Sequence, residues 1–450
     1  MVRGNQELRR VLVISFDFPP RRTSATYRLG NITRYLLSSR WHPTVLTIEP
    51  RPEHLLEPEQ FQKIPREIPI ERTSFWQIGK WEGVVHKKVR SAGKLKTPAG
   101  GDRPSAFDRM LRRLAAFVRS CLYFPDSSVG WVPFGFARGA KLLRQRHFDV
   151  IFSSEPPRSA SVVALLLRMT LGVPWVFELM DPWYAPARPL RRRFEHWFLG
   201  FMLRRADAVV VMTEGHERDL QERFGVPYSK LFVVPNGFDE EDFHPEDSAL
   251  VGQSTEMCAS GYIHFSHFGT VYPRNAGQFF PALAELLTER PELRNRVRFH
   301  LVGFPDEGIR QFVLQDSLRD VVEVRGFIPS HSQALREMYA SHCLVLFWGD
   351  RDFSRLAAAG KTYVYLRTGR PILAVTGPGT VAERIHAAQA GWVVNPDDPA
   401  AIKATLSEII CKLERNERLP GAHPGNLEQF RWDRLAERLA GVFDEVVDSG

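Results

Sequence analysis

The sequence has few cysteines and no long apolar run, and both absences narrow its class. Its four cysteines (Cys121, Cys258, Cys343 and Cys411) are widely spaced in 450 residues, so neither a disulfide framework nor a zinc-binding spacing is present. The longest apolar stretch, 161–177, is interrupted by arginine, glycine and proline and is too short to span a bilayer. The first residues lack the cleavage site of a signal peptide. We therefore expect a cytoplasmic protein, soluble or peripheral at the inner face of the membrane.

The excess of positive over negative charge is concentrated in one segment of the chain. The net charge is +8, and residues 80–119 hold eleven Lys and Arg against three acids, 11 − 3 = +8, so the remainder is formally neutral. A footprint for nucleic acid would be more widely spread and interleaved with aromatic residues. We expect no nucleic-acid partner, and a local anionic partner for this segment.

Residues 50–104 are rich in Pro, Lys and Arg and predict long loops, whereas residues 105–122 predict an amphipathic helix. Two interpretations of that helix stay open. It packs on the protein's own core with a solvated basic back, or its basic part, 105–119, lies on an anionic membrane surface. The apolar face comprises Phe107, Met110, Leu111, Leu114, Val118 and Cys121, and the opposite face Arg109, Arg112, Arg113 and Arg119.

The rest of the chain alternates buried strands with helices, which predicts an α/β fold with parallel sheets. The first unit is strand 11–16, helix 27–38 and strand 43–48, and similar units continue to residue 234. Residues 238–261 are rich in acidic and small residues and lose the alternation of strands and helices, which predicts a linker between two domains. A second α/β run follows, and a helix over 432–447 closes the chain.

The stretch 358–396 carries the clearest site signal. A helix from Lys361 is ended by Gly369, and a buried strand over 371–375 leads into Gly377-Pro378-Gly379. Thr380 is predicted to cap the next helix. A loop between the carboxyl end of a parallel strand and a helix N-terminus suits a phosphate, so we expect a nucleotide-diphosphate site here.

Several motifs follow one another in an order that is familiar. They are Phe18-Pro19-Pro20, FPDSSVGW at 124–131, SSEPPRSA at 153–160, Asp181-Pro182-Trp183, PNGFDEEDF at 235–243, HFGTVYPRN at 267–275, GFIPSHSQALREMYASHCLVLF at 326–347 and GKTYVYLRTGRPILAVT at 360–376. In this order the chain resembles the retaining GT-B-fold glycosyltransferases of the large bacterial polysaccharide and glycolipid family (family 4-like), in a subgroup with FPP and DPW motifs.

The resemblance implies two Rossmann-like domains facing across a cleft. Residues 1–240 would bind the acceptor and include a basic insertion over about 50–122. Residues 241–430 would bind the nucleotide-sugar donor, and 431–450 would form a helix crossing back to the first domain. It also implies a saccharide or lipid-linked acceptor, no cofactor beyond the donor as co-substrate, and no metal. The segment Asp350-Arg351-Asp352 is a formal metal motif, but solvated loop charges are commoner.

Carried over residue by residue, the family pattern places phosphate-binding cations at Arg274 and Lys361. Gly269 and Thr270 fall in the first loop of the donor domain, and backbone groups of Gly377, Pro378, Gly379 and Thr380 would also face the donor. In the first domain, Asp181 would lie near the reacting sugar, and Ser24, Ala25, Arg28 and Glu178 would line the acceptor or phosphate loop. The alternatives are an ordinary turn for 377–380, a surface role for the cations, a helix cap for Asp181 and a structural pair for Arg28.

The sequence departs from the family at the glutamate pair, whose positions hold Leu356 and Val364. Val364 cannot accept the hydrogen bonds of a ribose. This departure motivates a rival to a transferase, a catalytically reduced scaffold acting as a partner or regulatory subunit. An epimerase or phosphorylase of the same fold is a third, more distant alternative.

Overall fold

The computed structural model describes residues 8–51, 54–77, 123–183, 189–244, 261–315, 317–349 and 351–449. The basic segment 80–119, the predicted helix 105–122 and Asp350 lie outside these ranges. None of the helices within them is both long and apolar enough to cross a bilayer.

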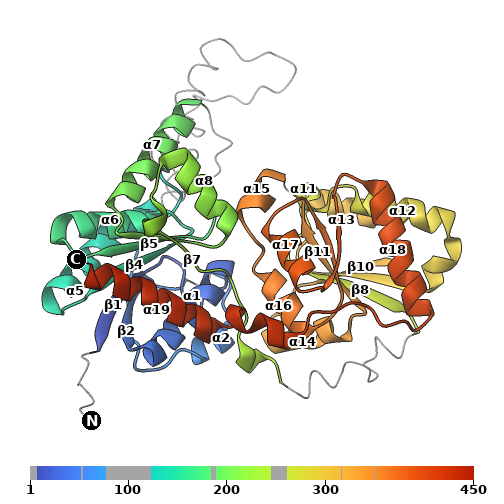
Figure 1. The fold of residues 1–450 in the computed structure, drawn as a ribbon, viewed down its shortest axis with the longest axis horizontal. Coiled ribbons are helices and arrows are strands. Elements are labelled where there is room, and N and C mark those ends of the chain that lie inside the picture. Colours follow the sequence, from blue (N-terminus) through green and yellow to red (C-terminus); the bar gives the residue numbers. More distant parts are fainter. Residues whose placement is uncertain are drawn as a thin grey trace, which may run out of the picture.

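The first domain is a parallel seven-stranded sheet with helices on both faces (Figure 1). Its strand order is β3-β2-β1-β4-β5-β6-β7. Every residue of β4 and β5 is buried, as expected where both faces of a sheet are covered. Helices α5 to α8 pack on one face, and α1 packs on the other. The strands are β1 (Arg9–Ile14), β2 (Trp41–Ile48), β3 (Ile70–Thr73), β4 (Val150–Glu155), β5 (Trp175–Leu179), β6 (Ala208–Val211) and β7 (Leu231–Val233); the helices are α1 (Ser24–Leu36), α2 (Pro58–Gln62), α5 (Val132–Gln145), α6 (Ser159–Leu171), α7 (Pro189–Arg205) and α8 (Glu214–Phe224).

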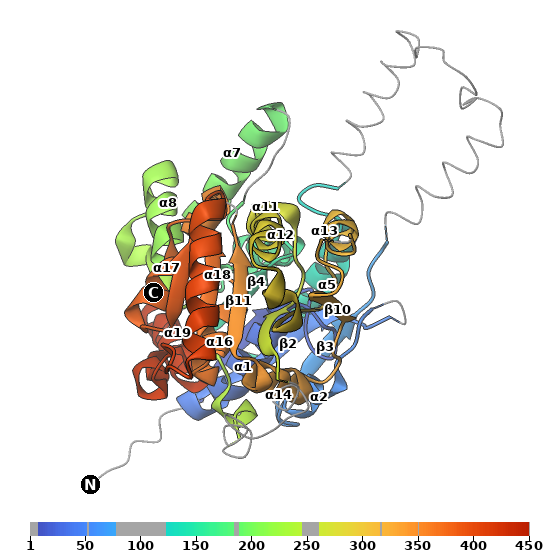
Figure 2. The ribbon, with the colours of Figure 1, turned by 90° about the vertical axis from the view of Figure 1, so that its right-hand side faces the viewer.

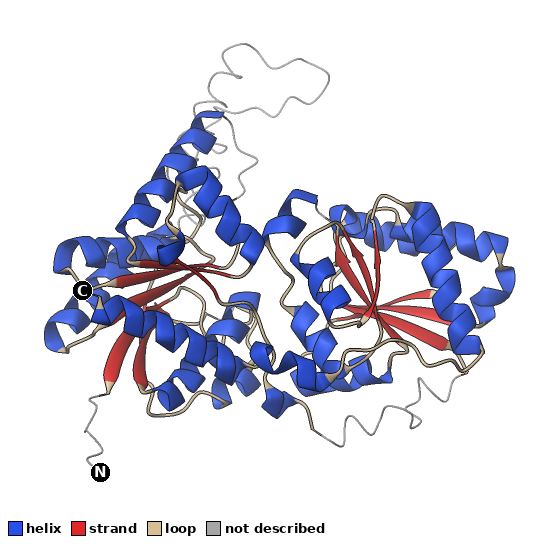
Figure 3. Ribbon diagram, viewed as in Figure 1, coloured by secondary structure: helices blue, strands red, loops and turns tan. Residues whose placement is uncertain are grey.

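The second domain repeats this plan with six parallel strands in the order β10-β9-β8-β11-β12-β13 (Figure 3). Helices α12, α13 and α18 pack on one face, and α14, α16 and α17 on the other. The strands are β8 (Ile263–Phe268), β9 (Val297–Val302), β10 (Val322–Gly326), β11 (Cys343–Trp348), β12 (Ile372–Thr376) and β13 (Gly391–Val394); the helices are α11 (Pro273–Ala276), α12 (Phe279–Glu289), α13 (Glu307–Val313), α14 (His331–Ala340), α15 (Arg351–Leu356), α16 (Lys361–Thr368), α17 (Thr380–Ala387) and α18 (Pro399–Glu414).

The last helix, α19 (Trp432–Asp448), returns to the first domain and lies along α1 (Figure 1). Its Phe443 packs edge-on against Trp41 at 5.2 Å between ring centroids, and Asp444 accepts from Arg9 at 2.7 Å. The chain crosses between the domains twice, and the crossings are hydrogen-bonded to each other. The amide of Phe238 donates to the Phe430 carbonyl, and the amide of Trp432 donates to the Phe238 carbonyl, each at 3.0 Å.

The α/β fold class and the two Rossmann-like sheets are confirmed. Two local predictions were wrong. Long loops were expected over 50–104, yet the segment also contains α2 and the edge strand β3, a short strand whose four residues are all only half-buried. Thr380 does not cap a helix, because it is the first residue of α17; the preceding position belongs to Gly379 at φ +147°.

The loops at the carboxyl ends of the two sheets contact each other. After β1, the Arg22 guanidinium donates to the Pro329 carbonyl after β10 at 3.2 Å and lies 3.7 Å from the Phe327 ring. After β6, the Thr213 hydroxyl donates to the Leu356 carbonyl after β11 at 2.6 Å. Since the strands of each sheet are parallel, the loops that can hold a ligand face each other across the domain boundary.

Candidate active site at the facing sheet edges

Lys361 and Tyr365, one turn apart on α16, both hydrogen-bond to the backbone of Phe268, the last residue of β8. The Lys361 ammonium donates to the Phe268 carbonyl at 2.6 Å, and the Phe268 amide donates to the Tyr365 hydroxyl at 2.8 Å. The spacing of four residues places both side chains on one face of the helix. The predicted site residue Lys361 therefore lies at the carboxyl end of a central strand, where burial lowers its pKa to about 8.

A buried histidine faces the same ammonium. His267 is 1% exposed, and its Nδ1 lies 2.8 Å from the Val345 carbonyl. Because a carbonyl only accepts, Nδ1 must carry the proton, which leaves Nε2 as an acceptor 3.3 Å from Lys361 Nζ. Burial, with Lys361 as a second cause, holds the pKa of His267 well below its usual value. The ring therefore stays neutral and orients the ammonium.

The loop after β8 needs glycine. Gly269 has φ +117°, and a Cβ there would lie 2.6 Å from Lys361 Nζ. Gly303, after β9, has φ +141°, and its Cβ would lie 2.5 Å from the Gly269 carbonyl oxygen. Only glycine, which lacks a Cβ, lets the backbone at these two positions approach its neighbours this closely. The predicted residue Gly269 thus joins Lys361 in one cluster.

Arg274 and Thr270 lie further out on the same loop, and both are exposed. Arg274 belongs to the short helix α11, and its guanidinium lies 5.7 Å from the Tyr272 ring centroid. Both residues follow the carboxyl end of β8, and Lys361 contacts that same end through the Phe268 carbonyl. The two predicted cations, Arg274 and Lys361, therefore belong to one sheet edge. An exposed guanidinium and a half-buried ammonium at one sheet edge are suited to an anion that is partly in solvent.

The loop 377–380 contacts α15 rather than standing open. Gly377 is buried, and a Cβ at Gly379 would lie 2.2 Å from the Ser354 carbonyl oxygen of α15. Pro378 remains exposed and Thr380 is buried at the start of α17. The loop does lie between a buried parallel strand and a helix N-terminus, with α15 packed against it.

The two positions of the missing glutamates have structural roles. Val364 is 7% exposed and packs in the apolar cluster under α16. Leu356 is half-buried, and its carbonyl accepts from Thr213 of the first domain. The one acid on α15 and α16 is Asp352, and its side chain is not among those that the structure describes.

In the first domain, most of the predicted acceptor residues point into the core. Ala25 is 1% exposed, and Ser24 is the first residue of α1. Arg28 and Glu178 are 1% and 0% exposed and form an ion pair at 2.7 Å. Arg28 also donates to the Val234 and Pro235 carbonyls at 2.9 and 2.7 Å. Arg28 thus forms the structural ion pair that was its alternative role, and Glu178 is the partner in that pair.

Asp181 follows β5 by two residues. Part of its surface is exposed, and partial desolvation of its carboxyl group raises its pKa. No helix described in the structure starts at Asp181, so the cap alternative does not hold. Beside it lies an acid that sequence reasoning missed. Glu155, 2% exposed at the end of β4, accepts from the Trp183 indole, and burial raises its pKa to about 8. An acid directly before two prolines at a strand end was the available signal.

Comparison with known proteins identifies the chain. Residues 23–237 match the glycosyl transferase 4-like domain family, and residues 265–412 match the glycosyl transferases group 1 family. The chain belongs to the GT-B-fold glycosyltransferases. The D-inositol 3-phosphate glycosyltransferase of Streptomyces scabiei is 25% identical over 251 residues, which cover 54% of each protein. The chain therefore spans about half the length of the curated relatives that it matches.

Solved structures share the fold of this chain over almost its whole length. Sucrose-phosphate synthase from Thermosynechococcus elongatus has a TM-score of 0.62 at 14% identity, covering 98% of this chain and 100% of the other. The Anabaena protein HepE in complex with UDP-glucose has a TM-score of 0.53 at 15% identity, covering 98% and 97%. At these identities the likeness establishes the GT-B fold alone.

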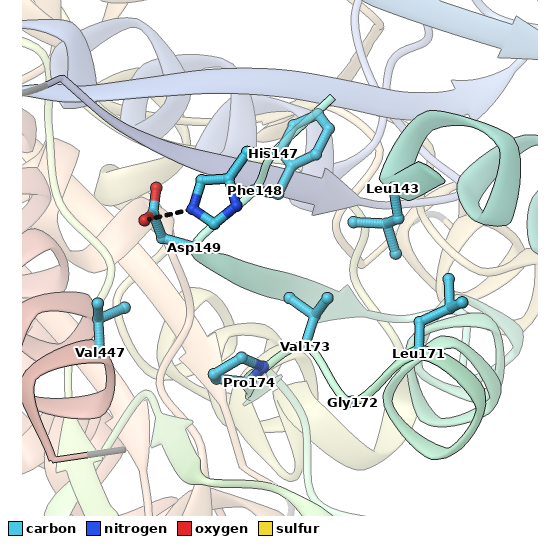
Figure 4. Close-up of a pocket in the computed structure, with 9 residues that line it drawn as sticks. All are labelled: Leu143, His147, Phe148, Asp149, Leu171, Gly172, Val173, Pro174 and Val447. Atoms are coloured by element: carbon cyan, nitrogen blue, oxygen red, sulfur yellow. Dashed lines mark hydrogen bonds and ion pairs between the residues drawn. The ribbon is translucent and has the colours of Figure 1, made fainter. Parts of the chain in front are cut away.

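A cavity elsewhere in the first domain does not belong to the site. It has a volume of about 350 Å³ and lies at the amino ends of β4 and β5, lined by the His147–Asp149 pair, Val173 and Val447 (Figure 4). Because ligands of parallel sheets bind at the carboxyl ends, this cavity is on the opposite edge. Among the described residues, no cluster of three His, Cys, Asp or Glu is arranged to hold a metal ion.

Proposed function

We propose that this glycosyltransferase moves a sugar from a nucleotide-diphosphate donor to a saccharide or lipid-linked acceptor in cell-surface polysaccharide biosynthesis. The proposal includes metal independence, retention of anomeric configuration and no resident cofactor. One observation carries it: the Lys361 ammonium is fixed at the carboxyl end of β8 by the Phe268 carbonyl and by neutral His267. Those contacts use two of its three N–H donors, and the third can meet a phosphate oxygen.

The leaving diphosphate accumulates negative charge as the glycosidic bond breaks. Fixed positive groups stabilise that charge without a metal, because they are oriented before the reaction begins. Lys361 is the buried cation and Arg274 the exposed one. Backbone N–H groups at the start of α17, beside Gly379, add a helix N-terminus. Asp181, exposed at the end of β5, would orient the acceptor hydroxyl. Binding of UDP-glucose by HepE, a protein of the same fold, supports a nucleotide-sugar donor.

The test measures nucleotide release from a panel of UDP- and GDP-sugars, which requires no knowledge of the acceptor. The double variant Lys361→Met/Arg274→Met should lose at least ~100-fold in turnover while circular dichroism stays unchanged. Lys403→Met/Arg310→Met, which removes two cations on α18 and α13 of the same domain, is the matched control and should retain activity.

Calorimetry with the same donors separates the transferase from the scaffold alternative. Binding of one donor at micromolar concentration, lost in the double variant, supports the transferase. Failure of every donor to bind the wild-type protein would refute it and leave a scaffold. Association with a membrane through 105–119 is a further part of the proposal, and those residues lie outside the described ranges.

A further inference from the structure

Helix α7 stands out from the first domain beyond the helices around it (Figures 1 and 2). It begins shortly after the Asp181-Pro182-Trp183 motif and ends at the sheet with Arg205. Its inner face is buried through Leu199, Met202 and Leu203. The outer face of the same helix has aromatic side chains in solvent, which a soluble domain does not need for its own core.

The outer face carries a continuous aromatic strip. Phe194 and Trp197 are 47% and 56% exposed, and their rings stack at 5.6 Å. Trp197 stacks on Phe201 at 6.0 Å, and the Arg205 guanidinium lies 5.2 Å from the Phe201 ring. Spacings of three and four residues place these side chains on one side of the helix. Phe124 supports the strip from below, 4.7 Å from Phe194.

Cations that have no acidic partner among the described residues flank the strip. Arg193 and Arg204 fall on the same side as Trp197, at spacings of four and seven residues, and both are exposed. The one acid of α7, Glu195, is 4% exposed and paired with Arg191 at 2.8 Å. The outer face therefore has positive charge that nothing on its own helix neutralises.

At the sheet end, the strip reaches a cavity of about 350 Å³ that is mostly basic. Arg168 pairs with Asp207 at 2.9 Å, the one acid that lines the cavity. The remaining charged lining residues are Arg204, Arg205 and Lys230. A cavity of this size with surplus cations accommodates a phosphate headgroup.

We propose that the outer face of α7 is a membrane-contact surface that lies on an anionic lipid bilayer. Tryptophan and arginine side chains are suited to the interface, where rings enter the acyl boundary and guanidinium groups remain at the phosphates. Charge complementarity selects an anionic bilayer over a neutral one. The surface is separate in sequence from 105–119.

The experiment is co-sedimentation of the full chain with vesicles of phosphatidylcholine and phosphatidylglycerol, and it needs neither donor nor turnover. The wild-type protein should bind anionic vesicles and release them in high salt. Arg193→Gln/Arg204→Gln should weaken partitioning about fivefold per cation, or roughly 25-fold. Trp197→Ala should weaken it several-fold.

Matched controls on the second domain are Arg415→Gln/Arg418→Gln and Leu314→Ala, all at exposed positions, and both should partition as the wild type does. Circular dichroism and thermal unfolding verify that each variant is folded. Equal binding to pure phosphatidylcholine, no binding by the wild type, or wild-type binding by the folded α7 variants would each overturn the proposal. Donor turnover in solution is measured separately, so a failure here leaves the proposed function untouched.

Discussion

The two domains use charged residues at the same edge of the same kind of sheet in opposite ways. In the first domain, Arg28 and Glu178 turn away from the edge and pair with each other in the core. In the second, Lys361 is held at the edge itself by carbonyl and imidazole groups. The difference lies in the partners. A carboxylate neutralises the charge of Arg28, so that this cation is not available to an anionic ligand, whereas neutral acceptors orient Lys361 and leave its charge available.

The largest effect on the free energy of unfolding is expected when one partner of the buried Arg28–Glu178 pair is removed. Arg28→Met leaves Glu178 as a buried carboxylate without a counter-charge and should lower the free energy of unfolding by about 3–5 kcal/mol. Urea unfolding followed by circular dichroism measures the loss. Arg28→Met/Glu178→Met, which removes both charges, should recover much of it. A double variant as unstable as the single one would show that packing, not charge, dominates.

A smaller effect is expected where the second domain needs close approach. Gly269→Ala introduces a Cβ 2.6 Å from Lys361 Nζ, whereas Gly225→Ala, also at positive φ, meets nothing within 4 Å. Both should lose about 1–2 kcal/mol in thermal unfolding from backbone strain. Only Gly269→Ala should also displace Lys361 and reduce donor turnover, by roughly 10- to 100-fold. Equal turnover in the two variants would remove Gly269 from the site.

The mildest perturbation is pH. Burial holds the pKa of Lys361 at about 8, so the ammonium is present below pH 8 and lost above it. Donor turnover should therefore decline about tenfold per pH unit above 8, and Lys361→Arg, which stays charged, should shift that decline to higher pH. A flat profile for the wild type would contradict the role. Because the folded pKa lies below the ordinary value of 10.5, Lys361 opposes folding below pH 8, and this penalty disappears between pH 8 and 10.5.

The fold was predictable because each element carries its own local signal. The strand expected over 371–375 is β12 (Ile372–Thr376), the helix expected over 432–447 is α19 (Trp432–Asp448), and α16 ends at Gly369 with φ +67°, as its sequence indicated. By contrast, β3 has four half-buried residues and little apolar patterning of its own. Its existence depends on pairing with β2, which a single segment does not reveal.

The candidate site was predictable only in part, for a related reason. Lys361 and Gly269 stand 92 positions apart (361 − 269), and motif order placed both at the donor loop. Motif order could not show that Arg28 would find Glu178, because both an edge position and a buried position suit an arginine at the start of α1. Nor could it show His267 or Glu155, whose roles depend on which atoms face them in the folded chain.

The paired crossings between the domains have a mechanical consequence. Phe238 shares two hydrogen bonds with the returning chain, and Arg28 grips the carbonyls of Val234 and Pro235 just before it. Because the two backbone segments are hydrogen-bonded to each other, bending the domains about this pair of segments would keep the hydrogen bonds. Twisting one domain against the other would break them. We therefore expect motion between the two domains to be mainly opening and closing, which would return the Lys361 edge to the same partner edge.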